Sequence, residues 1–178
     1  MENERLNIVM AVDTFYPVVG GVSTVVDLSA TALSEKANVT VVCVKAKGYD
    51  EPERKYSVLR CDGYYNKLTK DGMAKPYKDK EFLEKLDKMR IDLIVCHTAG
   101  NLMSFFNKYA KKRKIPLTAL VHNTMYGDAK HYAKLPFLAR WITKGFMKKT
   151  NQSDHVWCVS KFCRDYLIDF GLKKDASV

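Results

Sequence analysis

Short apolar segments alternate with longer amphipathic segments along this chain. Five segments of four to seven residues are almost continuously apolar and rich in Val, Ile and Leu, namely 6–12, 39–44, 92–96, 117–121 and 156–159. A continuous apolar run, unlike an alternating one, is typical of a strand that is buried on both faces of a parallel sheet. A weaker strand is predicted at 57–61, after a charged loop.

The segments between these strands carry apolar residues at helical spacing. The stripes are Val22, Val25, Val26, Ser29 and Leu33, then Phe82, Leu86 and Met89, then Leu102, Phe105, Phe106 and Tyr109. A further helix is expected at 161–170. Strands that alternate with helices predict an α/β fold, a doubly wound parallel sheet that is Rossmann-like, as one domain over residues 1–178.

Two segments depart from this alternation. Residues 63–80 are polar, basic and rich in Tyr, with Gly72 and Pro76 interrupting any regular pattern, so we expect a mobile loop there. After Gly171 the last residues, KKDASV, resemble the start of another strand. Because a domain rarely ends where a new element opens, we expect the chain to be a piece of a longer protein.

The composition is that of a soluble globular protein with a basic surface. Apolar residues make up 47% and charged residues 28%, and the net charge of +10 favours an anionic partner such as nucleic acid, acidic lipid or a phosphorylated substrate. Five cysteines without CxxC spacing indicate small buried hydrophobes and no metal site. The apolar runs are too short for a signal peptide or a membrane span, so we expect a cytoplasmic protein.

The residues that directly follow the strands are the candidates for chemistry. In an open parallel sheet, ligands bind beyond the carboxyl ends of the strands. Gly20 and Gly21 lie between the first strand and the first helix, where free backbone N–H groups at the positive helix end suit a phosphate or diphosphate. A tight strand-to-helix turn is the alternative explanation for this glycine pair. His97 and His122 each follow a strand at the same edge.

The common nucleotide-binding motifs fit this chain less well. No G-x-G-x-x-G follows the first strand, and Lys45 stands after the second strand where a ribose-binding carboxylate is expected. No G-x-x-x-x-G-K-[ST] occurs either, which argues against P-loop phosphoryl transfer.

Four segments resemble family 4 glycosyltransferases, which have the GT-B fold of two facing Rossmann-like domains. The opening VMAVDTFYPVVGGVSTVVDLSATAL is similar to the start of that family. The later matches, in the family's order, are DLIVCHTAGNL, IPLTALVHNTMYG and SDHVWCVSKFCRDYLIDFG. Their order and spacing cover nearly the whole chain, so the chain resembles the N-terminal, acceptor-side half of such an enzyme.

The resemblance implies a retaining transfer of a sugar from a nucleoside-diphosphate sugar to an acceptor hydroxyl, with no metal or other cofactor. By analogy, backbone amides at Gly20 and Gly21 bind the donor diphosphate, and His122 is the catalytic residue, orienting the transferred sugar or stabilising charge. The acceptor-side residues that the resemblance suggests are Asp13, Thr14, Tyr16, His97, Thr98, Asn123 and Tyr126.

One departure from the family is large. The donor domain of the family supplies a Glu-x7-Glu element, whereas no two glutamates here are eight positions apart. We therefore expect the C-terminal donor domain to be missing and this chain alone to be inactive as a transferase.

Residues 130–150 predict a basic amphipathic helix. Arg140, Lys144 and Lys148 fall on one side of a helical wheel, and the other side gathers Leu138, Trp141, Ile142 and Phe146. Such a helix suits an anionic membrane surface, and an ordinary core helix with a solvated face is equally compatible. Because many family members glycosylate lipid-linked acceptors, we expect a peripheral association of Arg140, Trp141, Lys144 and Lys148 with the inner face of the membrane and a glycan or glycolipid acceptor.

A second function class is a stand-alone basic Rossmann-like module that binds acidic membrane or nucleic acid. Tyr64, Tyr65 and Tyr77 among the lysines of 63–80 are compatible with it. A nucleic-acid module should interleave basic and aromatic residues along a sheet or groove, whereas the strands here are wholly apolar. No nucleic-acid partner is therefore expected.

Overall fold

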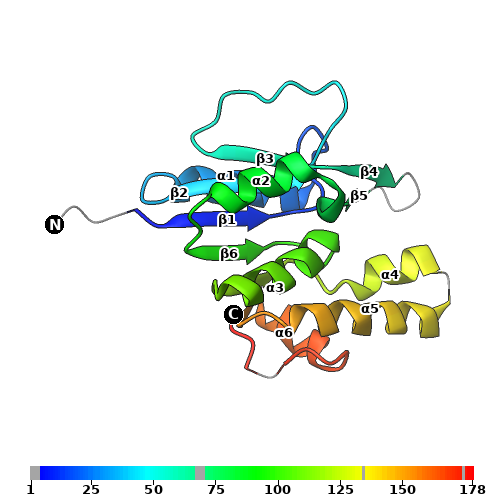
Figure 1. Cartoon of the computed structure of the whole chain (residues 1–178). Helices are drawn as coiled ribbons and strands as arrows, with labels where there is room; N and C mark the ends of the chain where they lie inside the picture. The colour runs from blue at the N-terminus through cyan, green and yellow to red at the C-terminus, as the bar shows by residue number, and fades with distance from the viewer. Residues whose placement is uncertain (1–4, 67–70, 134, 174) are drawn as a thin grey trace.

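The computed structural model describes residues 5–66, 71–133, 135–173 and 175–178. Its centre is a six-stranded parallel sheet in the order β3-β2-β1-β6-β7-β8 (Figure 1). The strands are β1 Asn7–Ala11, β2 Asn38–Val44, β3 Ser57–Cys61, β6 Leu93–Cys96, β7 Leu117–Val121 and β8 His155–Cys158. All six lie within or next to the segments predicted as strands, because each segment is apolar enough for a strand with two covered faces.

In the described part of the chain, six α-helices cover the two faces of the sheet, five of them in the connections between strands and the sixth after β8. They are α1 Gly21–Leu33, α2 Lys80–Lys88, α3 Asn101–Arg113, α4 Tyr126–Ala133, α5 Pro136–Thr150 and α6 Lys161–Ile168. Side chains of β1 alternate between two apolar clusters, so that Met10 packs with Val26 of α1 while Val9 joins the cluster containing Phe106 of α3. The doubly wound, Rossmann-like fold class is therefore confirmed.

The strand order reverses between β1 and β6. β2 and β3 extend the sheet on one side of β1, whereas β6, β7 and β8 extend it on the other. The loops at the carboxyl ends of β1 and β6 therefore leave in opposite directions, and this switch point is where open α/β sheets bind ligands.

The described residues of the segment 63–80 form regular elements, so the expectation of an irregular segment is wrong there, and residues 67–70 of the predicted loop lie outside the described part of the chain. β4 Gly63–Asn66 pairs with β5 Asp71–Ala74 as an antiparallel hairpin, and the 3-10 helix η1 Pro76–Lys78 follows. Gly72 permits a close approach here, because a Cβ at this position would lie 2.5 Å from the Asp13 carbonyl oxygen. The glycine that looked like a breaker is thus a packing position.

The basic segment 130–150 forms parts of two helices, α4 and α5, and Pro136 lies in the first turn of α5 as expected. α5 buries Ala139, Thr143, Met147 and Thr150. Trp141 is 73% exposed and shares the solvent side with the basic residues, so its predicted place on an opposite, apolar side is wrong. The buried side of α5 thus consists of Ala, Thr and one Met and not of the larger apolar residues.

The last residues pair with the edge of the sheet. The Cys158 N–H donates to the Ser177 carbonyl at 2.9 Å, and the Ser177 N–H donates to the Val156 carbonyl at 2.9 Å. This pairing is a single parallel bridge between Trp157 and Ser177, and among the described residues the end of the chain forms no strand, so the new strand expected after Gly171 stays a prediction. All five cysteines are free and buried, as small hydrophobes.

Candidate active site

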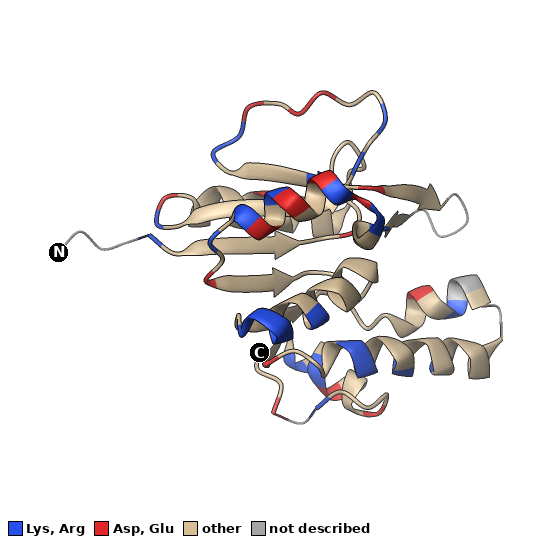
Figure 2. Cartoon of the chain, viewed as in Figure 1, with Lys and Arg blue, Asp and Glu red and all other residues tan. Residues whose placement is uncertain are grey.

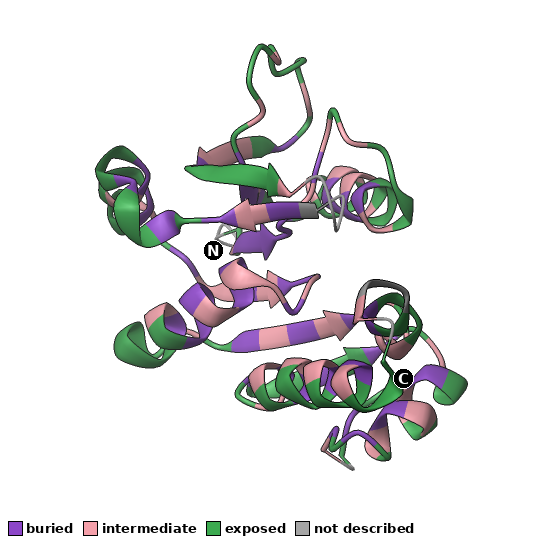
Figure 3. Cartoon of the chain, turned by 90° about the vertical axis from the view of Figure 1, so that its right-hand side faces the viewer, coloured by how far each residue is buried: buried purple, intermediate pink, exposed green. Residues whose placement is uncertain are grey.

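The residues expected at the site lie along the carboxyl edge of the sheet. Because the strands are parallel, the loops after β1, β6 and β7 leave from one edge, which is the edge facing the viewer in Figure 3. The β4–β5 and α4–α5 hairpins extend beyond this edge on either side of it (Figure 1).

The histidines after β6 and β7 contact each other directly. Nδ1 of His97 lies 3.0 Å from Nε2 of His122, and the two ring planes lie at 17° to each other with centroids 5.2 Å apart, so the rings meet edge to edge. His97 is only 3% exposed, whereas His122 is partly exposed at the edge. The contact follows from the fold, since β6 and β7 are adjacent parallel strands that both end in His.

Both histidines are electrically neutral at neutral pH. Burial lowers the pKa of His97 to about 3, and a positive charge on His122 would lower it further. Burial also lowers the pKa of His122. The pair therefore offers hydrogen-bonding nitrogens to a ligand and no fixed positive charge.

Asp13, after β1, holds the start of α3 in place. Its carboxylate accepts hydrogen bonds from the Asn101 and Leu102 N–H groups at 3.1 and 3.2 Å and from the Thr98 hydroxyl at 2.8 Å. Burial raises the pKa of Asp13 to about 6 in spite of these bonds. Gly100 makes the approach possible, since a Cβ there would lie 2.2 Å from Oδ2 of Asp13. Asp13 and Thr98 thus lie together, as expected, but their bonds are internal to the chain.

Gly20 and Gly21 form the entry to α1. Gly20 is the N-cap with an extended φ of −161°, and its N–H donates to the Ser23 hydroxyl at 2.8 Å. A Cβ on Gly21 would meet nothing within 4 Å, and a Cβ on Gly20 would make an ordinary contact. Neither glycine is required by a left-handed φ or by crowding. The tight-turn explanation therefore loses support, and the space beside Gly21 at the start of α1 is open.

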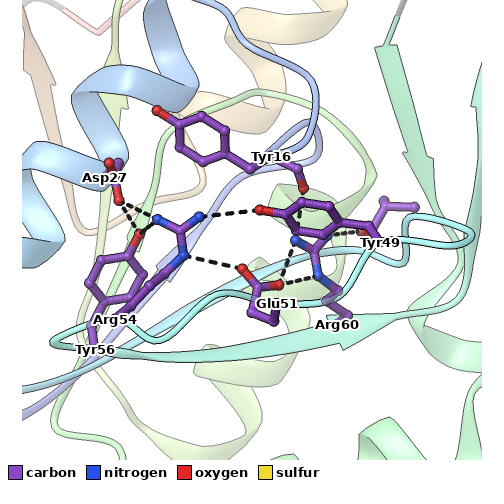
Figure 4. Close-up of polar contacts among 8 residues, drawn as sticks. Tyr16, Asp27, Tyr49, Glu51, Arg54, Tyr56 and Arg60 are labelled. Atoms are coloured by element: carbon purple, nitrogen blue, oxygen red, sulfur yellow. Dashed lines mark hydrogen bonds and ion pairs between the residues drawn. The ribbon is translucent and has the colours of Figure 1, made fainter.

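An ion-pair network holds the loop between β1 and α1 (Figure 4). Arg60 donates to the Tyr16 carbonyl at 2.8 Å and to Glu51 at 2.7 Å. Arg54 lies over the Tyr16 ring at 5.0 Å and donates to Glu51 at 3.2 Å and to Asp27 of α1 at 2.8 Å. Tyr16 thus lies in a network that fixes the loop carrying Gly20.

The remaining acceptor-side candidates lie at the same edge with partners of their own. Thr14 accepts a hydrogen bond from the Gly72 N–H of the hairpin at 2.7 Å. Asn123 bonds the Met125 N–H at 3.0 Å and Asp128 at 3.0 Å. Tyr126 packs on Phe170 with ring centroids 5.0 Å apart. These contacts make the three residues parts of the wall around the edge.

Sequence reasoning missed the residues that support the site. Gly72, Gly100, Arg54 and Arg60 each act through a partner that is distant in the sequence. Arg54 had a local signal, because it lies in a charged loop before an edge strand, and Arg60 lies within that strand. Nothing in this pattern names Tyr16 or Asp27 as their partners. A cavity of about 280 Å³ between β3, α2 and this loop contains Lys45, Arg60 and Glu81 and neither histidine.

The described part of the chain contains neither a cluster of metal ligands nor a helix that could span a membrane. No group of three or more His, Cys, Asp or Glu side chains there is arranged to hold a metal ion. Within the same residues, no helix combines the length and apolar character that crossing a bilayer requires.

The chain is similar to glycosyltransferases in sequence and structure. It is 24% identical over 171 residues to alpha-monoglucosyldiacylglycerol synthase of Streptococcus pneumoniae, a match over 93% of this chain and 38% of that protein. Crystal structures of Anabaena Alr3699/HepE with UDP-glucose and with UDP and glucose superpose with TM-scores of 0.66 and 0.67 at 11% and 12% identity. Each covers 98% of this chain.

The chain spans less than half the length of these proteins, 38% of the relative and 43% and 44% of the two structures. The superpositions confirm the fold, that of one Rossmann-like half of a GT-B enzyme. The model of Glycosyltransferase Family 4 matches residues 19–178, which include α1, both histidines and the end of the sheet. The chain belongs to glycosyltransferase family 4.

Proposed function

We propose that this chain is the acceptor-side half of a retaining glycosyltransferase, which transfers a hexose from a nucleoside-diphosphate sugar to the hydroxyl of a lipid or lipid-linked glycan. The observation that carries the proposal is the open glycine pair at the positive end of α1, on the same edge of the sheet as His122. Neighbouring structures that contain UDP-glucose, or UDP and glucose, support a nucleotide-sugar donor.

The glycine pair would bind the donor diphosphate. Amides in the first turn of a helix have no intrahelical acceptor and lie in the positive field of the helix dipole. With no Cβ above Gly21, a phosphate oxygen can reach these amides directly. This chemistry neutralises part of the charge on the leaving diphosphate and needs no metal ion or other cofactor.

His122 would act beside the transferred sugar. Its ring is neutral at neutral pH because it is partly buried, so it orients the sugar through a hydrogen bond and does not supply a positive charge. His97 and Thr98 would line the acceptor side, together with Asp13, Thr14, Tyr16, Asn123 and Tyr126. A second domain would bring the carboxylates and basic residues that bind the nucleotide, and without it the chain would not transfer sugar.

A matched pair of glycine substitutions tests the diphosphate site. Cβ atoms at Gly21 and at Gly145 of α5 both meet nothing within 4 Å, so Gly21→Ala and Gly145→Ala should each keep or slightly raise stability, by up to about 1 kcal/mol. In an enzyme that joins this chain to a donor domain, Gly21→Ala should raise the KM for the nucleotide sugar about tenfold, whereas Gly145→Ala should not change it. Equal KM values for both variants would contradict the site.

The acceptor proposal rests on the exposed face of α5. Phe137 and Trp141 are 72% and 73% exposed, and Arg140, Lys144 and Lys148 are exposed on the same side of the helix. Figure 2 shows blue segments along α5 and at the end of α3. A helix side that exposes aromatic side chains beside basic ones suits the interface of an anionic bilayer. The name of the pneumococcal relative, a glucosyldiacylglycerol synthase, favours a lipid acceptor.

Vesicle sedimentation tests this membrane role. We expect the chain to bind vesicles containing anionic lipid and not neutral vesicles. Lys144→Glu with Lys148→Glu should reduce binding at least tenfold, since each basic residue near such a surface contributes about 1 kcal/mol. Lys85→Glu with Lys88→Glu, on α2, is the control with the same charge change. Equal binding to both kinds of vesicle, or equal loss in both double variants, would contradict it.

A further inference from the structure

We propose that His97 is a positioning residue, which holds His122 in one ring orientation and one tautomer so that His122 presents Nδ1–H to the substrate. The inference rests on the proposed function of His122 beside the transferred sugar. It goes beyond that function because it names the reacting face of the imidazole, its protonation and the residue that sets both.

The orientation follows from the fixed position of His97. Its ring is almost fully buried, and its backbone N–H donates to the Ala11 carbonyl at 2.8 Å, which ties it to the end of β1. His122 lies nearer the surface at the end of β7, with Nε2 directed at Nδ1 of His97 at 3.0 Å. The two nitrogens of an imidazole point in divergent directions. With Nε2 engaged inside the protein, Nδ1 is the atom of His122 that remains for a ligand.

The tautomer follows from the count of hydrogens. Each ring is neutral and therefore carries one N–H, and a single hydrogen lies between the rings. If His122 donated it, His97 would hold its own hydrogen on Nε2, which is buried and has no hydrogen-bond partner. If His97 donates from Nδ1, its Nε2 is only a bare lone pair. A buried N–H without an acceptor is the rarer arrangement in proteins, so His97 donates.

The hydrogen bond from His97 determines which nitrogen of His122 is protonated. Because Nε2 accepts from His97, the hydrogen of His122 must be on Nδ1. The ring then offers a hydrogen-bond donor to a sugar oxygen and has no free nitrogen to take up a proton. His122 is thus an orienting donor and not a general base. In free histidine the Nε2–H tautomer is favoured. An Nδ1–H tautomer of His122 would therefore indicate the influence of His97.

Long-range ¹H–¹⁵N correlation spectra of the ¹⁵N-labelled chain at pH 7 measure the tautomers. We expect a protonated Nδ1 and an unprotonated Nε2 for His122, and the same for His97. His97→Asn keeps an amide donor at the position of Nδ1, so His122 should keep Nδ1–H. His97→Phe keeps the ring and removes the donor, so His122 should change to Nε2–H.

The two variants separate positioning from space filling. If His97 merely fills space, Phe should preserve the His122 signals and Asn should change them, the reverse of our expectation. A protonated Nε2 on His122 of the unsubstituted chain overturns the proposal, even if the Phe variant does not fold. The spectra need no nucleotide sugar, so a failure to bind or transfer sugar would count against the proposed function and leave the tautomer result standing.

Discussion

At the scale of single residues, the buried histidine makes the stability of the chain depend on pH. Between pH 6.5 and about pH 3 the unfolded chain binds a proton at His97 that the folded chain does not bind. The unfolding free energy therefore rises with pH in this window, by about 1.4 kcal/mol per pH unit for this one group. Asp13 acts in the opposite direction between pH 3.8 and about 6, because its pKa is raised in the folded state.

The variant His97→Asn isolates this effect, since it removes one titrating group and leaves Asp13 in place. We expect urea unfolding at pH 7 to show the largest stability advantage of the unsubstituted chain over the variant. The advantage should shrink towards pH 4, where protonation of unfolded His97 penalises only the unsubstituted chain. His122, whose pKa is also lowered by burial, is present in both proteins, so its contribution cancels from the difference. Parallel curves of stability against pH would contradict a neutral, buried His97.

Single residues also show how far the sequence predicts the site. The contact between His97 and His122 was accessible in part, because each follows an apolar strand and both were expected at the same edge of the sheet, but the adjacency of the two strands comes from the structure. The role of Asp13 was not accessible, since its bonds reach Asn101 and Leu102, 88 and 89 positions away. Local sequence patterns show which side chains lie at the carboxyl edge of the sheet, but tertiary packing determines which groups those side chains contact.

At the scale of elements, the strands with continuous apolar runs were predicted correctly, whereas the positions at which elements pack closely were not. The strands of the sheet follow from their apolar runs, whereas the β4–β5 hairpin was hidden behind its glycines. Gly63 and Gly72 lie against β2 and the end of β1, where a Cβ would be 2.6 Å from Val44 and 2.5 Å from Asp13. The sequence alone does not distinguish a glycine that lets another segment approach closely from a glycine that interrupts a regular element. The buried side of α5 was mispredicted because Ala and Thr, not the large apolar residues, pack closest.

Arg54 links Asp27 of α1, Glu51 and the ring of Tyr16. Its replacement tests how much the network in Figure 4 contributes to the stability of the fold. Its side chain is 13% exposed and pairs with Asp27 and Glu51. Arg54→Leu would leave Asp27 with only the Tyr56 hydroxyl and Glu51 with only Arg60, so we expect a loss of about 3 kcal/mol of unfolding free energy in urea. The control is Lys85→Leu, which breaks the exposed pair with Glu81 and should cost about 0.5 kcal/mol or less. Equal losses would show that the network is not needed for stability.

At the scale of the whole molecule, the two faces of the sheet are covered unequally. Among the described residues, the face that contains Met10 and Val41 packs against α1, and its apolar cluster includes no residue of β7 or β8. The other face packs against helices along the full width of the sheet, from Phe82 of α2 to Leu167 of α6. Trp157 of β8 is accordingly 55% exposed, although it stands in the middle of a strand.

The unequal covering of the two faces of the sheet can be tested at two valines near the end of β8. Val156 is buried in the larger cluster, whereas Val159, just beyond the strand, lies on the open side with Trp157 and is exposed. Val→Thr keeps the shape of the side chain and adds a hydroxyl, which costs about 1–3 kcal/mol in a buried apolar site and little in water. Urea unfolding should therefore show a large loss for Val156→Thr and a change within about 0.5 kcal/mol for Val159→Thr. If Val159→Thr were as costly as Val156→Thr, the open side of β8 would have to be covered in solution, and the unequal packing of the two faces would be wrong.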